Sequence, residues 1–526
     1  MNQNNISAAE LFQRVRELLT LPDLEPKTRN KMMHDTLILC CHEGVKDTKQ
    51  AFGNLFSQVD YLCKARGIKV ADKIAIQTMR RHSNSQEPLS GEDLKYDARA
   101  LTLFISAVFE ERIPHEVNVL IPHINRPFQK GLEINNRRIR CIVKNWDSDF
   151  IRVDIDQDAD EEEYLVRLKD EENHIDHTYL WDLLKEGMQL NLLDCQVKQP
   201  IITPRLIVVE PDYLVDISSI AICFTAFGHH PLLYLLNLMK PRANTQATLL
   251  GNFAGAALDD IINSHGKYQV NETVKSNFRE KALEFCTCPW FDAKKFYTDA
   301  SLQAFNLQQV VDILFPRTAS QAKMSAFRGE SLYDRKKAIL EPSFVCEALG
   351  IQGRVDLMTT DCKLLVEQKS GRNMNIETHQ VDPGYHSYQL EPHYVQLLLY
   401  YGVLQHNFKL SNDRVNIRLL YSKYQPQDGL MVVAYYQKLF KEAIEYRNQL
   451  VAASFEIAKE GFEHALNEFT PEVLNVAGTQ DFFYNKYLKP QIEAITNPLH
   501  DLSPLEEAYF CRMMTFVLRE QMISKV

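Results

Sequence analysis

The spacing of hydrophobic positions separates a helical first segment from the rest of the chain. Apolar residues recur at helical spacing in Ala8–Leu19, Leu37–Leu62 and Ala98–Phe109. The polar stretch His82–Asp93 is rich in the residues that form loops between helices. Residues 1–112 are therefore predicted to be an N-terminal helical region.

From about Ile113 the pattern changes to short alternating or wholly apolar runs. The runs VNVLI, RRIRCIVKNW, DFIRVDI, EYLVRL and LNLLDCQV follow one another and are separated by turn-like polar residues. Such runs are typical of strands. We expect a small, OB-like β-barrel over residues 113–207.

After about Val208 helical and strand-like patterns alternate. The helical patterns cover Leu214–Met239, Leu249–Ser264, Val274–Phe285, Pro392–Gln405, Met431–Glu460 and Pro504–Ser524. The strand-like patterns cover Gln352–Met358, Lys363–Lys369 and Val415–Tyr421. We expect a mixed α/β core over residues 208–460 and a C-terminal helical extension over residues 461–526.

Length and composition narrow the class of protein. A chain of 526 residues is expected to hold about three domains, and 45% hydrophobic with 24% charged residues is typical of a globular protein. The 59 Lys and Arg against 69 Asp and Glu give a net charge of −10. That balance excludes a wholly basic nucleic-acid binder but not an enzyme with a local basic groove.

Cysteine usage and hydropathy predict a cytoplasmic, intracellular protein that is soluble and has no membrane partner. The 11 cysteines show no CxxC pair and no regular spacing, which favours reduced thiols over a disulfide framework. The N-terminus lacks the pattern of a signal peptide. The longest apolar stretches, such as Val395–Leu404, are about half the roughly 20 residues that a membrane span needs.

The most informative segment for chemistry is residues 341–372. Two strand-like runs, 352–358 and 363–369, flank a turn-like stretch. A two-residue loop at Asp361 and Cys362 would join them as a hairpin. Counting outward from that loop sets the register of the two strands.

In this register two carboxylates face each other. Met358 opposes Leu365, and Asp356 opposes Glu367, with Cβ atoms of opposed residues roughly 4.5–5.5 Å apart. Like charges so placed destabilise a sheet unless a cation lies between them, and carboxylate oxygens suit magnesium or manganese. Lys369 follows Glu367 by two positions and so projects from the same face.

Asp, Glu and Lys on one face suit metal-assisted hydrolysis of a phosphodiester bond. The carboxylates would hold the cation, and the ammonium would position a water or stabilise charge that develops on phosphorus. The alternative is a surface hairpin with a solvated Glu–Lys pair. ExK alone is common in any sequence, whereas D(x10)ExK on a hairpin is more specific.

These residues resemble the PD-(D/E)XK nucleases in their RecB-like branch. D(x10)ExK is preceded by GR-V, and a QxxxY motif follows at Gln396 and Tyr400, with His393 one turn earlier. Spacings of three and four place these side chains on one helical face. The likeness is strongest to the nuclease region of flap-processing replication helicase–nucleases and to CRISPR-adaptation exonucleases, and covers roughly Asp194–Ala452.

The resemblance implies a restriction-endonuclease-like core, in which a mixed central sheet is flanked by helices and accompanied by a small β-barrel. It implies Mg²⁺ or Mn²⁺ held by Asp356, Glu367 and the Gln368 carbonyl, with Lys369 as the catalytic lysine. Gln396 and Tyr400 would orient the site and contact the DNA strand. Further candidates for the site are His393, Arg354 and the preceding acidic residue Glu341.

The sequence departs from the family pattern at a metal ligand. Many RecB-like nucleases carry a His in an early helix, four residues after a Gly, and the corresponding position here is Gly255. Asp259 or Asp260, one turn further along, are candidate substitutes, although both also fit an ordinary exposed helix end. His265 is a further candidate in an expected loop.

Relatives of this type often hold an iron–sulfur cluster with four cysteines, and this chain departs from that pattern too. Cys223 matches the first of the four, but only Cys511 follows the QxxxY motif, so no cluster is expected. A GxxxxGK[ST] phosphate loop is absent from the sequence. Because such relatives commonly continue into a helicase, a downstream helicase domain is an expected partner.

The sequence leaves three hypotheses for function. The first is a metal-dependent deoxyribonuclease that acts on single-stranded or flap DNA, as the nuclease part of a helicase–nuclease in DNA repair or replication. The second is a catalytically weak, nuclease-like DNA-binding or scaffolding module, which the Gly at position 255 favours. The third is an interaction protein that uses the helices and the barrel, where Arg137, Arg138, Arg140 and Lys144 lie near Trp146.

Overall fold

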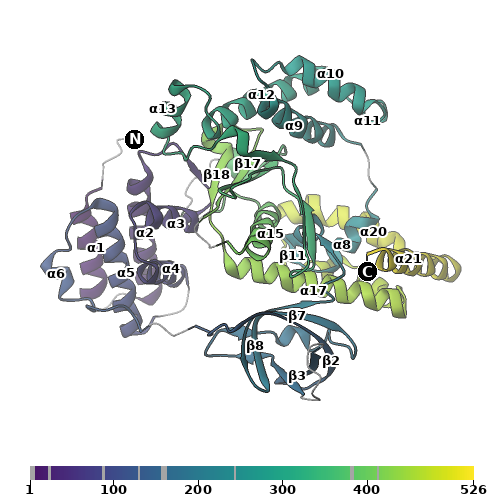
Figure 1. Cartoon of the computed structure of the whole chain (residues 1–526), viewed down its shortest axis with the longest axis horizontal. Helices are drawn as coiled ribbons and strands as arrows, with labels where there is room; N and C mark the ends of the chain where they lie inside the picture. The colour runs from purple at the N-terminus through teal and green to yellow at the C-terminus, as the bar shows by residue number, and fades with distance from the viewer. Residues whose placement is uncertain are drawn as a thin grey trace.

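The structure is a computed structural model, and the mixed α/β fold expected from the sequence is confirmed. It describes residues 6–21, 25–85, 89–127, 131–155, 163–241, 244–378, 384, 386–410 and 414–525. Helices, mixed sheets and a closed β-barrel lie side by side in Figure 1. No helix among the described residues is both long and apolar enough to cross a lipid bilayer.

The N-terminal helices pack around a hydrophobic core of their own. They are α1 (Ala8–Thr20), α2 (Pro26–Val45), α3 (Leu55–Ala65), α4 (Val70–Ser83) and α5 (Gly91–Phe109). The predicted continuous helix Leu37–Leu62 is wrong, because strand β1 (Ala51–Phe52) interrupts it and pairs with the main sheet. Asn54 then starts α3 by accepting a hydrogen bond from the backbone N–H of Ser57.

The predicted barrel is present as a closed arrangement of strands in the order β2-β3-β4-β8-β7. The strands are β2 (Asn136–Trp146), β3 (Phe150–Ile155), β4 (Tyr164–Arg167), β7 (Gln189–Lys198) and β8 (Ile201–Val209). The strand predicted at VNVLI is wrong: a short helix, α6 (His115–Asn118), begins there after Pro114. Pro fits a helix start because the first N–H groups of a helix lack intrahelical partners.

In the described part of the chain, a main sheet has the strand order β1-β18-β17-β16-β15-β12. Its remaining strands are β12 (Ala338–Leu340), β15 (Leu357–Thr359), β16 (Leu364–Lys369), β17 (Asn416–Tyr421) and β18 (Leu430–Val433). Residues of α15 (Glu391–Phe408) and α17 (Gln437–Glu460) pack on one face, and those of α9 (Gln246–Asn263) and α12 (Ala293–Leu314) on the other. The helix predicted from Met431 therefore starts later, because residues 430–433 pair with β17.

A second sheet consists of β13 (Ser343–Cys346), β14 (Ile351–Arg354) and β9 (Val215–Asp216). The pairs β12–β15 and β13–β14 share one register, so they form a single antiparallel ribbon that passes from the main sheet into the second sheet. The predicted strand Gln352–Met358 is wrong in one respect, because the ribbon bends at Val355 and Asp356. The backbone N–H of Glu341 donates to the Asp356 carbonyl at this bend.

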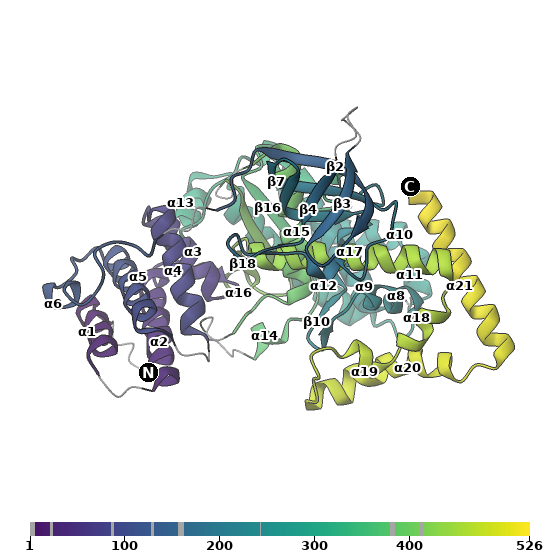
Figure 2. The ribbon, with the colours of Figure 1, turned by 90° about the horizontal axis from the view of Figure 1, so that it is seen from below.

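The remaining helices pack around these sheets. The helix predicted at Leu214–Met239 is divided into α7 (Ile217–Ala221), β10 (Phe224–Thr225), β11 (Gly228–His229) and α8 (Leu232–Met239). Further helices are α10 (Val270–Glu280), α11 (Ala282–Cys286), α13 (Ala319–Phe327), α20 (Lys489–His500) and α21 (Pro504–Lys525). Figure 2 shows α21 running beside α17, with residues of both in one hydrophobic core.

One buried side chain joins α17 to both the barrel and the second sheet. Arg447 is fully buried and donates hydrogen bonds to the carbonyls of Val209, Glu210, Tyr213 and Gly350. Burial lowers the pKa of its guanidinium to about 9, and the nearby Glu210 carboxylate partly opposes that effect. A Cβ at Gly350 would lie 2.4 Å from this guanidinium, so only Gly leaves room for it.

Arg447→Lys is expected to lower the free energy of unfolding by on the order of 3 kcal/mol, because one ammonium cannot satisfy carbonyls that the planar guanidinium reaches together. Urea denaturation followed by circular dichroism measures the loss. Arg512→Lys, at an exposed position of α21, is the matched control. Equal unfolding midpoints for the two variants would contradict the prediction.

Candidate functional site

The hairpin that carries Asp356 and Glu367 has the predicted register. Met358 pairs with Leu365, and Leu357 pairs with Val366, which places Asp356 across from Glu367 at the end of β15. The predicted two-residue loop is wrong, because the ladder ends one pair earlier and the loop spans residues 360–363. The hydroxyl of Thr359, just before the loop, accepts hydrogen bonds from the N–H groups of Lys363 and Leu364 at the far end of the loop and so closes it.

Asp356 and Glu367 are both held by β16. The Asp356 carboxylate accepts a hydrogen bond of 2.6 Å from the backbone N–H of Gln368. Glu367 is only 2% exposed, and its Oε1 accepts a hydrogen bond of 2.8 Å from Lys369 Nζ. Its Oε2 is buried and has no hydrogen-bond partner in the described part of the chain. An orphaned carboxylate oxygen in the interior is costly unless a cation or donor compensates it.

Helix α15 supplies the other side of the site. Gln396 Oε1 accepts a hydrogen bond of 2.8 Å from Lys369 Nζ, so the lysine is held between α15 and Glu367. The buried Tyr400 donates its hydroxyl hydrogen to the Arg354 carbonyl at 2.6 Å. Tyr400 therefore positions the strand that leads to Asp356, and its contact with DNA stays a prediction.

His393 lies on the same face of α15, where its Nδ1 is 3.0 Å from the Tyr421 hydroxyl. Burial, aided by the charge of Lys369, lowers the pKa of His393 to about 4. The imidazole is therefore neutral near pH 7. The structure places it as a neutral neighbour of the lysine, an imidazole that keeps one ring N–H but carries no positive charge at that pH.

The carboxylates of the site disfavour one another's charge. Burial first, and the charge of the neighbouring Asp356 second, raise the pKa of Glu367 to about 8, against the opposing effect of Lys369. Burial also raises the pKa of Asp356. Such raised values in a cluster of like charges are typical of sites that bind a cation or perform acid–base chemistry.

Helix α9 brings in a further carboxylate. Burial, together with Glu341, Asp260 and Asp356, raises the pKa of Asp259 to about 6. Asp260 faces elsewhere, because its carboxylate accepts a hydrogen bond from the Thr273 hydroxyl of α10. Of the two candidates on this helix, Asp259 is the one whose charge interacts with the site.

Gly255 lies on the face of α9 that is turned to the site. A Cβ at Gly251 would lie 3.1 Å from the Ser370 hydroxyl, and the charge of Asp259 interacts with that of Asp356. Residues four apart lie on one face of a helix, so the face of α9 that holds Gly251 and Asp259 is turned to the site. Gly255 falls on that face. A Cβ there would meet no heavy atom within 4 Å. His265 is exposed in the loop after α9.

Glu341 and Arg354 form an ion pair of 3.1 Å at the rim of the site. Both are exposed, and Glu341 adopts a left-handed backbone with φ 48° at the bend of the ribbon. In the ribbon register Glu341 lies across from Asp356. Asp356 is thus flanked by Glu341 on one side and Glu367 on the other.

The carboxylate oxygens of the site are of the chemical type that binds a divalent cation. The carboxylates of Asp356 and Glu367 interact electrostatically, and among the described residues the buried Glu367 Oε2 has no hydrogen-bond partner. No group of three or more His, Cys, Asp or Glu side chains that could hold a metal ion is found among the described residues. A cation here would therefore need ligands beyond these side chains, such as water or the Gln368 carbonyl, whose role stays a prediction.

Residues distant in the sequence form hydrogen bonds that hold the end of β16. Ser422, which follows β17, accepts a hydrogen bond from the Gln368 side chain, and Gln303 of α12 accepts one from the Ser422 hydroxyl. Gln303 also donates to the Ser370 carbonyl at 3.1 Å. Neither residue belongs to a motif, so only the fold could reveal them.

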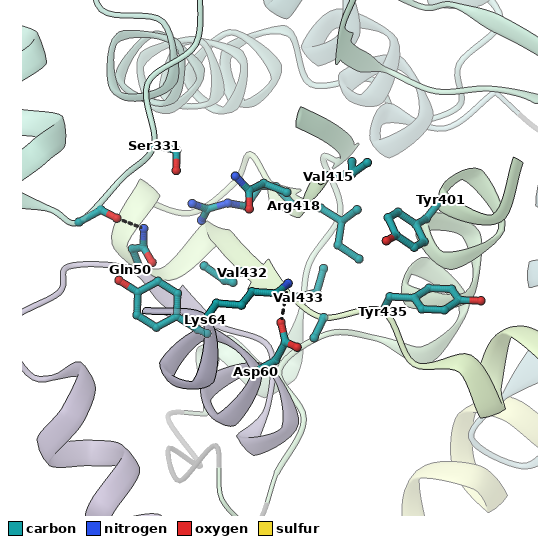
Figure 3. A pocket seen from close by; sticks show the side chains of 15 residues that line it. Gln50, Asp60, Lys64, Ser331, Tyr401, Val415, Arg418, Val432, Val433 and Tyr435 are labelled. Atoms are coloured by element: carbon teal, nitrogen blue, oxygen red, sulfur yellow. Dashed lines mark hydrogen bonds and ion pairs between the residues drawn. The ribbon is translucent and has the colours of Figure 1, made fainter. Parts of the chain in front are cut away.

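The barrel, and the junction between the N-terminal helices and the main sheet, offer weaker sites. Arg137, Arg140 and Lys144 of β2 are paired with Asp194, Asp212 and Asp154, so that strand is largely neutralised. A cavity of about 80 Å³ lies between the N-terminal helices and the main sheet, beside Arg418 (Figure 3). It is far smaller than the roughly 300–1,000 Å³ of ordinary ligand pockets.

Comparison with protein families and with curated proteins finds no match to this chain.

Glu367→Gln is expected to stabilise the protein in EDTA, more so as the pH rises. A Glu whose pKa is about 8 in the folded state and near 4.5 when unfolded contributes stability that is fully present below 4.5 and lost as the pH rises through 8. Gln does not titrate, so the variant escapes this loss, by on the order of 2 kcal/mol at pH 9. Thermal unfolding at pH 5 and pH 9 measures the difference, with the exposed Glu347→Gln as control.

Proposed function

We propose that this chain is an intracellular, divalent-metal-dependent deoxyribonuclease that hydrolyses phosphodiester bonds in single-stranded or flap DNA. The observation that carries the proposal is the cluster at the bend of the ribbon. There Asp356, Glu367 and Lys369 meet Gln396, and one buried carboxylate oxygen lacks a partner. The resemblance to RecB-like nucleases assigns the same residues to catalysis.

In this proposal Asp356, Glu367 and the Gln368 carbonyl would hold Mg²⁺ or Mn²⁺, with Asp259 nearby. Such a cation supplies Lewis-acid polarisation of the phosphate and an activated water. Lys369 has three N–H bonds and gives two to Glu367 and Gln396. The third is left to orient a water or to bind a phosphate oxygen.

Two features support an enzyme over a scaffolding module. A group of buried carboxylates that raise one another's pKa opposes folding, and a module without chemistry has no use for it. The Asp259 carboxylate also lies one turn from Gly255, where relatives carry a His. The place of the missing ligand is thus next to another oxygen donor.

Asp356→Ala, Glu367→Ala and Lys369→Ala are each expected to reduce cleavage by about a thousandfold or more while the fold persists. Labelled single-stranded DNA is incubated with Mg²⁺, then Mn²⁺, then EDTA, and products are resolved on a gel. Lys337→Ala, at an exposed lysine of the neighbouring strand end, is the control. Full activity in any of the three variants would remove the claim, and a wild-type protein that binds DNA without cleaving it would favour the scaffold.

Gly255→His is expected to lower the Mn²⁺ concentration for half-maximal cleavage by about tenfold, equivalent to about 1.4 kcal/mol. The open space at Gly255 admits the side chain, and an imidazole on this face of α9 would add a nitrogen donor to the carboxylates. Asn252→His, at an exposed position of the same helix, is the matched control. The same Mn²⁺ dependence in both variants would place Gly255 outside the metal site.

A further inference from the structure

The turn between α11 and α12 presents an indole that serves no purpose in the fold. Trp290 is 98% exposed, so its large apolar side chain gains nothing from burial. Its backbone is left-handed with φ 57°, a conformation that is rare for bulky residues and costs on the order of 1–3 kcal/mol. Both features oppose folding, which points to a role in binding.

The backbone of this turn is nevertheless well held. The N–H of Asp292 donates to the Gln246 side chain at 2.9 Å, and the Asn244 side chain donates to the Thr287 hydroxyl at 2.8 Å. Just inside, Phe278, Phe285, Phe291 and Phe296 pack ring against ring. The indole is thus displayed on a rigid base, which suits a surface that stacks on a flat ligand.

Two cations accompany the indole. Lys294 and Lys295 are exposed in the first turn of α12, where the helix dipole disfavours positive charge. In the described part of the chain neither forms an ion pair. They are therefore available to an anionic ligand, and a nucleotide combines a flat base with an anionic phosphate.

The turn lies close to the candidate site. Gln246, which holds it, is five residues before Gly251, or about 7.5 Å along the axis of α9. Gly251 contacts Ser370, the residue after Lys369. Figure 1 shows α9, α11 and α12 grouped on one side of the main sheet. The turn is therefore held by the same helix that contacts the residue after Lys369.

We infer that Trp290, with Lys294 and Lys295, is a binding platform for single-stranded DNA, on which one base stacks while the lysines contact phosphates. The inference rests on the proposed nuclease function. Aromatic stacking together with positive charge is the usual chemistry by which proteins bind single strands without reading sequence. Paired bases in a duplex do not expose their faces, so the platform selects unpaired DNA.

The test uses the whole chain in EDTA, so that DNA is bound but not cleaved. The sequence has 3 tryptophans, and Trp290 is the most exposed of them, so oligothymidylate is expected to quench the intrinsic fluorescence. Trp290→Ala should abolish most of the quenching and weaken binding by about tenfold, while Trp290→Phe restores much of the affinity. Leu283→Ala, an exposed apolar residue of α11, is the matched control.

The lysines are tested by the salt dependence of the same binding. Replacing Lys294 and Lys295 with Ala should reduce the slope of log Kd against log salt by about 1.4, since single strands lose roughly 0.7 per phosphate contact. Lys275→Ala, whose ammonium already pairs with Glu272, should leave the slope unchanged.

Unchanged affinity in Trp290→Ala, equal loss in Leu283→Ala, equal binding of a duplex, or no binding by the wild type would each overturn the inference. These results are distinct from a failure of the proposed function. That failure would appear as a wild type that binds single strands and is quenched by them but cleaves nothing with Mg²⁺ or Mn²⁺.

Discussion

The buried guanidinium of Arg447 is the interaction on which the arrangement of the molecule depends. From α17 it bonds carbonyls at the end of β8, before β9 and before β14, and so fixes the barrel against the second sheet. The ribbon that continues from β14 carries Asp356 into the site, where Tyr400 holds the preceding carbonyl of Arg354. Because packed interiors transmit displacements, a shift at Arg447 would reach the carboxylates.

The sequence alone predicts the chemically decisive pairing, and the reason is geometric. Asp356 and Glu367 are related by counting across a turn, and lengthening that turn by one residue on each side leaves the pairing unchanged. The predicted two-residue loop is therefore wrong, whereas the predicted register is correct. In the same way, the spacing of Gln396 and Tyr400 on a helix is sufficient to bring both to one face, wherever the helix begins.

What the sequence could not predict depends on tertiary contacts. The ribbon bends at Asp356 because one part of it belongs to the main sheet and the other to the second sheet. A local sequence pattern does not show which strands those two parts pair with. Asp259 and Asp260 have the same chemistry and differ by about 100° around the helix. Only the packing of α10, through Thr273, decides which of them is turned away. Trp290 lies in a turn without periodicity, so its exposure and backbone are visible only in the fold.

The net charge of −10 has a local consequence on the proposed function. At the site the carboxylates outnumber the cations, and Lys369 and Arg354 are each already paired with a glutamate. At a pH above their raised pKa values, these carboxylates would oppose a phosphodiester that approaches without a metal ion. The proposed platform at Trp290 instead carries two exposed lysines, Lys294 and Lys295. On the proposed function, strand binding and strand cleavage would therefore depend on different charges. Binding would use exposed lysines and an indole, whereas cleavage would need a cation beside the carboxylates.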